Sequence, residues 1–215
     1  MIAVWDARQL PLADGSVDLV LTDPPYSVKY HRLWREMVAE AARVLRPGGF
    51  LAVMVGILGL DILFAACREA GLNYYALYVQ YLPGGATGIV WRRSGHRHIP
   101  IIARCKYVAV FTKDKGLAQM TTVNFVVASQ APKRWHEWAQ DVDTFRYFVE
   151  AFSPPGGLVL DPMAGSGTTA IAAAVIDRYW AVGDIDIRAA KTMRHRIIER
   201  QRAGLMCPLP LFNMS

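Results

Sequence analysis

The sequence predicts an open, mainly parallel α/β sheet with helices on both faces. Short apolar runs that suit buried strands alternate along the chain with longer segments whose apolar residues recur at helical spacing, and this alternation is typical of parallel sheets. Glycine and proline clusters follow several predicted helices and end them. The first two predicted strands each end at an aspartate, which places acids at the edge where such sheets bind ligands.

The chain carries no linker, internal repeat or low-complexity tract, so we expect one domain spanning residues 1–215. In chain order, its first half is expected to hold strands at 2–5 and 17–22, a helix at 31–45, a strand at 50–55, a helix at 60–70, and strands at 74–82 and 107–112. The second half is expected to hold a helix at 142–152, a strand at 158–160, a helix at 168–176, a strand at 180–183 and a basic helix at 187–202.

Composition excludes several classes of protein. Hydrophobic residues make up 53% of the chain and charged residues 20%, which suits a globular domain and argues against disorder. Three scattered cysteines are too few for a disulfide framework, and no secretion signal is visible. The longest apolar run, residues 50–67, is interrupted by Asp61 and two glycines, so it favours a buried strand and helix over a membrane span. We therefore expect a cytoplasmic protein with no membrane partner.

Positive charge is concentrated in one acid-free stretch. No Asp or Glu occurs between Glu69 and Asp114, and a glycine-rich, basic excursion covers residues 84–106 between two predicted strands. Concentrated positive charge is typical of proteins that bind a phosphate backbone, whereas a solvated loop is the alternative. A second basic cluster lies in the last predicted helix. The cations of the excursion expected to contact nucleic acid are Arg92, Arg93, Arg97 and Arg104.

A glycine-rich turn follows the strand predicted at 158–160. Its sequence is Asp161-Pro162-Met163-Ala164-Gly165-Ser166-Gly167-Thr168-Thr169. Glycines at such a turn let a ligand approach the main chain closely. A nucleotide-phosphate loop would carry Lys after its last glycine, where this chain has Thr168, so the pattern argues against a triphosphatase. Asp184 follows the next strand at about the spacing of the ribose-binding acid in dinucleotide folds. A ribose-containing cofactor is therefore favoured over a purely structural turn.

A second motif, Thr22-Asp23-Pro24-Pro25-Tyr26, follows the strand predicted at 17–22. Consecutive prolines fix φ and remove two backbone donors, which leaves carbonyl oxygens free to accept hydrogen bonds from a substrate. Asp23 adds a side-chain acceptor, and Tyr26 adds a ring for stacking. Together these groups suit a planar amine held by both of its hydrogens, and a Pro-Pro turn without a function is the alternative.

The two motifs resemble those of the DNA amino-methyltransferases. Residues 23–26 are similar to the catalytic Asp-Pro-Pro-Tyr motif of that family, and residues 161–169 are similar to its cofactor motif. The catalytic motif comes first, as in the β-type members, which are circularly permuted. Further similarity at residues 5–7, 43–49 and 182–186 extends the resemblance along nearly the whole chain. It implies a Rossmann-like, circularly permuted fold that depends on S-adenosylmethionine.

The resemblance also implies roles for individual residues. Asp23 and the Pro24 carbonyl would hold the exocyclic amine of a base flipped out of DNA, with Pro25 and Tyr26 completing the catalytic motif. Asp at the first position is commoner in the adenine enzymes than in the cytosine enzymes. S-adenosylmethionine contacts are expected from Asp6, Ala7, Asp161, Pro162, Met163, Gly165, Ser166, Gly167, Thr168, Thr169, Asp184 and Ile185.

A bacterial or phage origin, a part in restriction–modification and a possible homodimer follow from the same resemblance. The histidines and cysteines form no metal-ligand pattern, so we expect no metal. Three features depart from the family pattern. Met163 stands where the family often has an aromatic residue, and Asp184 stands where it often has Glu. Gln140-Asp141-Val142 stands where it often has Lys-Pro. The alternatives are a cytosine-N4 DNA methyltransferase, a methyltransferase acting on protein side-chain amides, and a catalytically silent DNA-binding module.

Overall fold

The computed structural model describes residues 1–81, 88–94, 97–103, 105–127 and 141–204, with the backbone alone described for residue 28 and for 88–94 and 97–103. Within this part of the chain, eight strands form one sheet in the order β1-β10-β9-β2-β3-β7-β4-β8. These strands are β1 (Ile2–Val4), β2 (Val17–Thr22), β3 (Leu45–Val55), β4 (Asn73–Tyr81), β7 (Cys105–Thr112), β8 (Phe125–Val127), β9 (Leu158–Asp161) and β10 (Tyr179–Asp184).

The strands of this sheet run in one direction except for β7. The pairs from β1 through β10, β9 and β2 to β3 are all parallel, and so is the pair of β4 and β8. Strand β7 is antiparallel to both of its neighbours, β3 and β4. The prediction of a mainly parallel sheet is therefore confirmed. Because β7 is reversed, it begins at the edge of the sheet where the other strands end.

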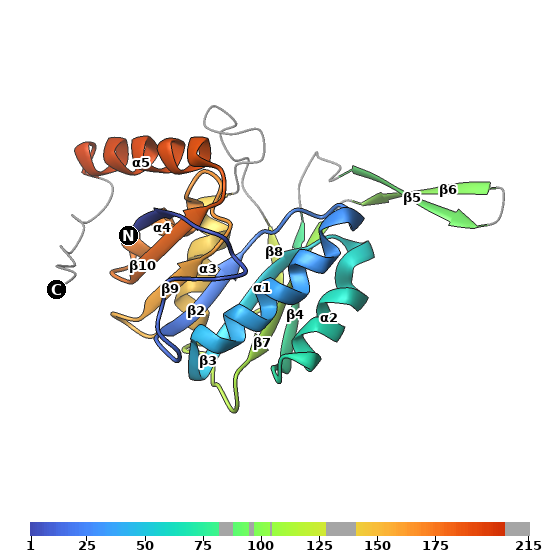
Figure 1. Cartoon of the computed structure of the whole chain (residues 1–215), viewed down its shortest axis with the longest axis horizontal. Coiled ribbons are helices and arrows are strands. Elements are labelled where there is room, and N and C mark those ends of the chain that lie inside the picture. Colours follow the sequence, from blue (N-terminus) through green and yellow to red (C-terminus); the bar gives the residue numbers. More distant parts are fainter. Residues whose placement is uncertain (82–87, 95–96, 104, 128–140, 205–215) are drawn as a thin grey trace.

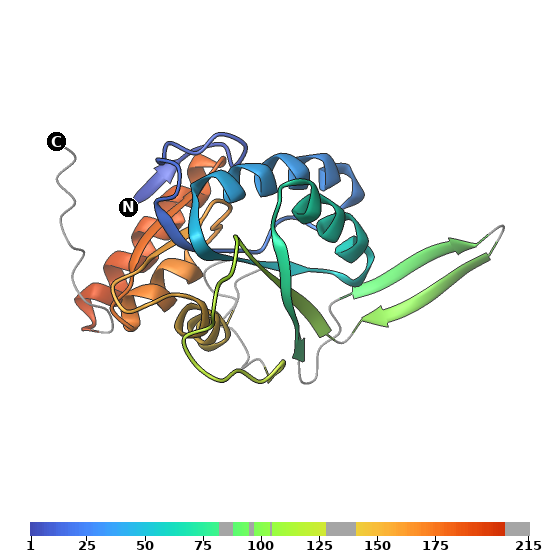
Figure 2. The ribbon, with the colours of Figure 1, turned by 90° about the horizontal axis from the view of Figure 1, so that it is seen from below.

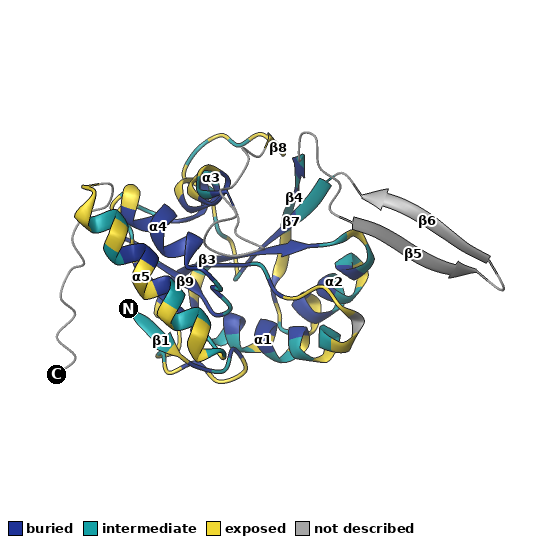
Figure 3. Ribbon diagram, turned by 90° about the horizontal axis from the view of Figure 1, so that it is seen from above, coloured by how far each residue is buried: buried dark blue, intermediate teal, exposed yellow. Residues whose placement is uncertain are grey.

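Helices cover both faces of the sheet (Figures 1 and 3). On one face lie α1 (His31–Val44) and α2 (Leu60–Glu69), and on the other lie α3 (Val142–Phe152), α4 (Thr168–Val175) and α5 (Ile187–Arg202). Helix α1 buries an apolar stripe at helical spacing. The eight-residue α4 is almost wholly buried and mostly apolar, because it packs against both α3 and strands β9 and β10. In the described part of the chain, no helix has the length and apolar character needed to cross a membrane.

The helices and strands predicted from the sequence all form, with small differences at their ends. The largest difference is at β3, which begins at Leu45, because Leu45 pairs with Val17 before the register shifts and Phe50 pairs with Leu19. Gly48, inside this irregular stretch, has a φ of +78°, which favours glycine. Three short elements were not predicted, because three residues are too few to show a period. They are β8, η1 (Val28–Tyr30) and η2 (Ile57–Gly59).

The basic excursion predicted as a loop contains an antiparallel hairpin. Strand β5 (Gly88–Ser94) pairs with β6 (Arg97–Ala103), and Figures 1 and 2 show the hairpin projecting from the main body on the side of α2. Arg92, Arg93 and Arg97 lie in its outer half, near the turn. Their side chains fall outside the described part of the structure, as does Arg104 entirely. Contact between these arginines and DNA therefore stays a prediction.

Candidate active site

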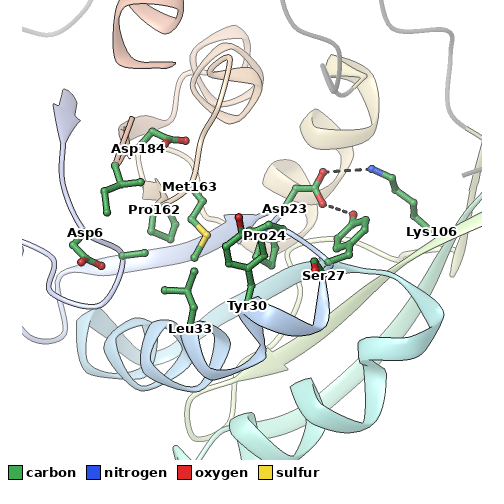
Figure 4. Close-up of a pocket in the computed structure, with 14 residues that line it drawn as sticks. Asp6, Asp23, Pro24, Ser27, Tyr30, Leu33, Lys106, Pro162, Met163 and Asp184 are labelled. Atoms are coloured by element: carbon green, nitrogen blue, oxygen red, sulfur yellow. Dashed lines mark hydrogen bonds and ion pairs between the residues drawn. The ribbon is translucent and has the colours of Figure 1, made fainter. Parts of the chain in front are cut away.

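A pocket of about 660 Å³ opens at the carboxyl edge of the parallel strands. It gathers residues at or just after the ends of β1, β2, β9 and β10, together with one residue of β7 and others from the segment before α1 and from its first turn (Figure 4). The residues that line it are Asp6, Ala7, Asp23, Pro24, Pro25, Tyr26, Ser27, Tyr30, Leu33, Lys106, Pro162, Met163, Asp184 and Ile185. The structure thus brings the two predicted motifs together around one cavity.

The cofactor end of the pocket is organised by Asp184. Its Oδ2 accepts a hydrogen bond from the Gly165 backbone N–H at 3.1 Å, and its Oδ1 accepts one from Asp186 at 2.9 Å. Gly165 has a φ of +50°, and a Cβ added there would meet no atom within 4 Å. The glycine is therefore needed for its backbone conformation and not for lack of space. Each carboxylate oxygen of Asp184 keeps a further lone pair for a ligand.

Asp161 lies behind the pocket wall and does not line it. Its side chain is 3% exposed, and its carboxylate accepts hydrogen bonds from the Met163 N–H, at 3.1 Å, and from the Thr169 hydroxyl. Burial raises the pKa of Asp161 to about 7. In the described structure this acid orders the glycine-rich turn, and its direct contact with the cofactor stays a prediction.

The glycine-rich turn is also held from behind by Arg196 of α5. This arginine is 3% exposed, and its Nη1 donates to the Ser166 carbonyl at 3.2 Å and to the hydroxyls of Ser166 and Thr168, each at 2.9 Å. Arg196 belongs to the second basic cluster of the sequence, in the last predicted helix, but its side chain faces inward. Its spacing from the buried Met193 and Ile197 places all three on one helical face, which was the available signal.

The segment that follows β1 contributes a packing contact from Trp5 and an acid, Asp6. The Trp5 indole N–H donates to the Pro162 carbonyl at 3.1 Å, and a Cβ added at Gly183 would lie 2.3 Å from the Trp5 ring. Gly183 therefore lets the indole pack against β10. Asp6 lines the pocket, but its carboxylate also binds Arg8, with Nε to Oδ1 at 3.0 Å and Nη2 to Oδ2 at 2.6 Å. This pairing lowers the pKa of Asp6, so the acid is ionised when a ligand arrives.

The Pro-Pro turn is fixed by a tryptophan, Trp34, whose role was not predicted from the sequence. The indole N–H of the fully buried Trp34 donates to the Pro25 carbonyl at 3.1 Å. A Cβ added at Gly59 would lie 2.5 Å from the Trp34 ring, so the ring also depends on this glycine. No hydrogen bond reaches the Pro24 carbonyl within the described residues. One proline carbonyl is thus used for structure, and the other is left for a substrate.

Asp23, Tyr26 and Lys106 meet at the other end of the pocket (Figure 4). The Tyr26 hydroxyl donates to Asp23 Oδ1, and Lys106 Nζ lies 3.4 Å from Asp23 Oδ2. The Tyr26 residue is 37% exposed, but its hydroxyl is buried, and this burial together with the Asp23 charge raises the pKa of Tyr26 well above its usual value. The hydroxyl therefore remains a neutral donor at physiological pH.

Four lining residues were not predicted from the sequence, namely Ser27, Tyr30, Leu33 and Lys106. The first three flank the Pro-Pro motif along the chain, so their proximity was the available signal. The prediction of cofactor residues divides into two groups. Asp6, Ala7, Pro162, Met163, Asp184 and Ile185 line the pocket, whereas Asp161, Gly165, Ser166, Gly167, Thr168 and Thr169 do not. No cluster of three metal-binding side chains occurs among the described residues.

The two ends of the pocket suit two different ligands. The carboxylates of Asp6 and Asp184 match ribose hydroxyls and an amino group, while Met163 and the 70% exposed Ile185 offer apolar surface for an adenine ring. The other end offers acceptors and an aromatic ring to a planar amine. A pocket of this kind, at the carboxyl edge of a Rossmann-like sheet, defines an S-adenosylmethionine-dependent methyltransferase.

The comparisons with known proteins agree with this class. A DNA methylase family model matches residues 86–194, about half of the chain, and a methyltransferase-domain model matches residues 2–53. The chain therefore belongs to the DNA methylase family that comprises amino-methyltransferases of adenine N6 and cytosine N4. It is 25% identical to YubD of Escherichia coli K12 over 204 residues, which cover 88% of this chain and 85% of YubD.

A second relative is longer than this chain. The type II methyltransferase M.HpaI of Haemophilus parainfluenzae is 23% identical over 190 residues, which cover 73% of this chain and 60% of M.HpaI. Among solved structures, the cytosine-N4-specific PvuII DNA methyltransferase superposes with a TM-score of 0.76 at 15% identity, covering 95% of this chain and 90% of that one. The M1.HpyAVI complex with S-adenosylmethionine superposes with a TM-score of 0.73 at 19% identity, covering 91% of this chain and 98% of that one. The methyl donor of this fold is S-adenosylmethionine.

Proposed function

We propose that the protein methylates the exocyclic N6 amine of an adenine flipped out of duplex DNA. The observation that carries this proposal is that one pocket joins the cofactor end, at Asp184, to the amine-holding end, at Asp23. The DNA methylase family supplies the class of substrate, and the Asp at the head of the catalytic motif favours adenine.

Asp23 and Pro24 would act by orienting the amine. The lone pair of a nucleobase amine is conjugated with the ring, so the amine is a poor nucleophile while it is planar. Hydrogen bonds from its two hydrogens to the Asp23 carboxylate and the Pro24 carbonyl would hold the nitrogen nearer to tetrahedral and aim its lone pair along the pocket. When bound, S-adenosylmethionine supplies an electrophilic methyl group on a positively charged sulfur. The protein then contributes orientation and stabilises positive charge developing on the nitrogen.

The base must leave the duplex before it can reach Asp23, which costs a few kcal/mol of unstacking. Stacking on Tyr26 would recover part of this cost, because base–aromatic stacking contributes about 1 to 3 kcal/mol per base. The Tyr26 ring, which is partly exposed and lines the pocket, suits this role. The Tyr26 hydroxyl donates to Asp23 Oδ1, so the target amine would share this carboxylate with Tyr26.

Contact with the DNA backbone is assigned in this proposal to the basic excursion at 84–106. Its hairpin follows β4 and precedes β7, and the reversed β7 begins at the pocket edge. A hairpin anchored there suits a surface that meets a duplex while one base enters the pocket. The arginines assigned to this contact are Arg92, Arg93, Arg97 and Arg104.

Cytosine N4 is the second candidate target, because the solved PvuII enzyme with TM-score 0.76 is cytosine-N4-specific. Both bases present an amine that Asp23 and Pro24 can grip. The test is to incubate the protein with methyl-labelled S-adenosylmethionine and unmethylated genomic DNA, digest the DNA to nucleosides and identify the labelled product by mass spectrometry. Labelled N6-methyl-2′-deoxyadenosine supports the proposal. Labelled N4-methyl-2′-deoxycytidine alone would overturn the choice of base.

The same labelling separates the other two alternatives. Label recovered in protein rather than DNA would indicate a side-chain amide methyltransferase. Cofactor and DNA binding without transfer of label would indicate a silent binding module. Sequencing of the labelled DNA then identifies the methylated site, which supplies a defined duplex for further experiments.

A further inference from the structure

Lys106 reaches the substrate end of the pocket because β7 runs against its neighbours. It is the second residue of β7 and lies opposite Gln80 of β4 in the sheet register. Its side chain is 14% exposed, and its Nζ lies 3.4 Å from Asp23 Oδ2 and 5.4 Å from the centre of the Tyr26 ring. A cation is therefore built into the group that holds the target amine.

The position of Lys106 within the pocket separates it from the cofactor. Among the described residues that line the pocket, it is the single cation, alongside the carboxylates of Asp6, Asp23 and Asp184. Figure 4 shows it next to Asp23, with Asp6 and Asp184 grouped at the opposite end. Its hydrogen-bond donors are therefore directed toward the substrate.

We infer that Lys106 recognises the target base by donating a hydrogen bond to the ring nitrogen beside the amine. This inference rests on the proposed function. Adenine and cytosine each carry an amine, which donates, next to a ring nitrogen, which accepts. Asp23 and Lys106 present the complementary acceptor and donor side by side. An ammonium has three donors on a four-carbon stem, so it can move from Asp23 to the ring while the amine takes its place on the carboxylate.

The signs of the charges on Lys106 and on the reacting amine indicate which kinetic constant depends on Lys106. Positive charge develops on the amine nitrogen during methyl transfer, and a cation that stayed on Asp23 would oppose it. A hydrogen bond to the ring nitrogen also draws electron density away from the amine. Lys106 therefore contributes to binding of the flipped base and not to the rate of the chemical step. Loss of its charge raises KM for DNA and leaves kcat nearly unchanged.

The test is a cycle that changes both Lys106 and the base. K106M keeps the length and apolar stem of the side chain. The substrate is the duplex mapped for the proposed function, with either the natural target base or one whose ring nitrogen beside the amine is replaced by C–H. For adenine these are the 1-deaza and 7-deaza bases, and for cytosine it is the 3-deaza base. A hydrogen bond from a charged donor predicts that the parent protein loses about 10- to 100-fold in kcat/KM on one deaza substrate.

The inference requires that kcat/KM of K106M on the natural base be about 10- to 100-fold lower than that of the parent. On the deaza substrate, kcat/KM of K106M should fall by less than about 3-fold further. K106R, which keeps a donor, should recover part of the loss. K115M removes an exposed lysine that follows the end of β7, at the sheet edge opposite the pocket, and should behave as the parent. Unchanged melting temperature and cofactor affinity show that K106M is folded.

Equal losses for parent and K106M on every deaza substrate would overturn the inference, since the two changes would then be independent. So would a K106M defect that appears only as a shallower salt dependence, which would assign Lys106 to a phosphate. Failure of the parent to methylate the natural duplex would instead contradict the proposed function, so the two failures are distinguishable.

Discussion

Nη1 of Arg196 lies 2.9 Å from the Ser166 hydroxyl and ties helix α5 to the glycine-rich turn. The same nitrogen also contacts the Ser166 carbonyl and the Thr168 hydroxyl, all in a buried setting. A residue that belongs to a basic stretch of sequence thus supports the cofactor end of the pocket from behind, without lining it.

Arg196→Met should destabilise the protein by at least about 1.5 to 3 kcal/mol, because it removes charge-assisted hydrogen bonds and leaves buried hydroxyl groups unpaired. Cofactor affinity should fall as well, since the turn loses its support. Urea unfolding and titration calorimetry with S-adenosylmethionine measure the two effects. Arg194→Ala, an exposed arginine on the same helix, is the matched control and should change neither. An Arg196 variant with parental stability and parental affinity for the cofactor would show that the glycine-rich turn keeps its conformation without Arg196.

Asp23→Ala and Asp184→Ala should have opposite effects, because the two acids lie at opposite ends of the pocket. We expect the Asp23 variant to lose methyl transfer while its affinity for the cofactor stays nearly intact. The Asp184 variant should chiefly lose cofactor affinity, by about 1.5 to 3 kcal/mol, as a charged acceptor is removed. Cofactor affinity is measured by titration with S-adenosylmethionine, and activity is measured as methyl transfer to DNA. Near-normal turnover by Asp23→Ala would contradict its assigned role.

Asp161 predicts a particular pH dependence of stability. Its pKa in the folded protein is about 7, above the ordinary 3.8, so the folded state binds more protons than the unfolded state between these values. The free energy of unfolding should therefore fall as the pH rises from about 4 to 7, by a few kcal/mol, and then level off. Asp161→Asn keeps the shape without the charge. The stability difference, variant minus parent, should grow over that pH range in urea unfolding. A difference independent of pH would show that the acid is ionised throughout.

Trp34→Phe tests how the Pro-Pro turn is fixed. The substitution keeps a ring in the buried site but removes the N–H that donates to Pro25. We expect kcat for methyl transfer to fall about tenfold, since a small displacement of the Pro24 carbonyl misdirects the amine. Cofactor affinity should not change, because Trp34 does not line the pocket. An equal loss of both properties would instead indicate a general loss of structure.

Replacing Arg92, Arg93 and Arg97 with Ala tests the hairpin as a DNA contact. Each cation that neutralises a phosphate contributes about 0.9 to the slope of log affinity against log salt. The triple variant should therefore have a slope smaller by up to about 2 to 3 units and weaker binding to all DNA sequences, with unchanged cofactor affinity. Fluorescence anisotropy at several salt concentrations measures this. If slope and affinity stay parental, the exposed cations of α5 become the better assignment.

Much of the fold was predictable because the signals were local. The apolar stripe of α1 and the glycines after it mark a helix and its end wherever the chain folds. Strands β2, β9 and β10 each carry an acid at the carboxyl end, and parallel packing brings such ends to one edge. That edge holds the pocket, which is lined by residues 23–26 and by several of the residues that the family resemblance assigned to the cofactor. The short elements β8, η1 and η2 were missed because three residues show no period, and the β5–β6 hairpin was missed because its glycine-rich, basic sequence indicates a loop.

The sequence by itself determined the order of the strands and helices, the two motifs and the chemistry that their side chains carry. Only the tertiary structure decided how Asp161, Arg196 and Lys106 are used. The Asp161 side chain is buried, and Arg196, although it belongs to a basic stretch of sequence, lies on the buried face of its helix. Lys106 reached Asp23, 83 positions away along the chain. The physical reason is that such contacts depend on strand direction, register and helix rotation, which are set when the whole core is buried.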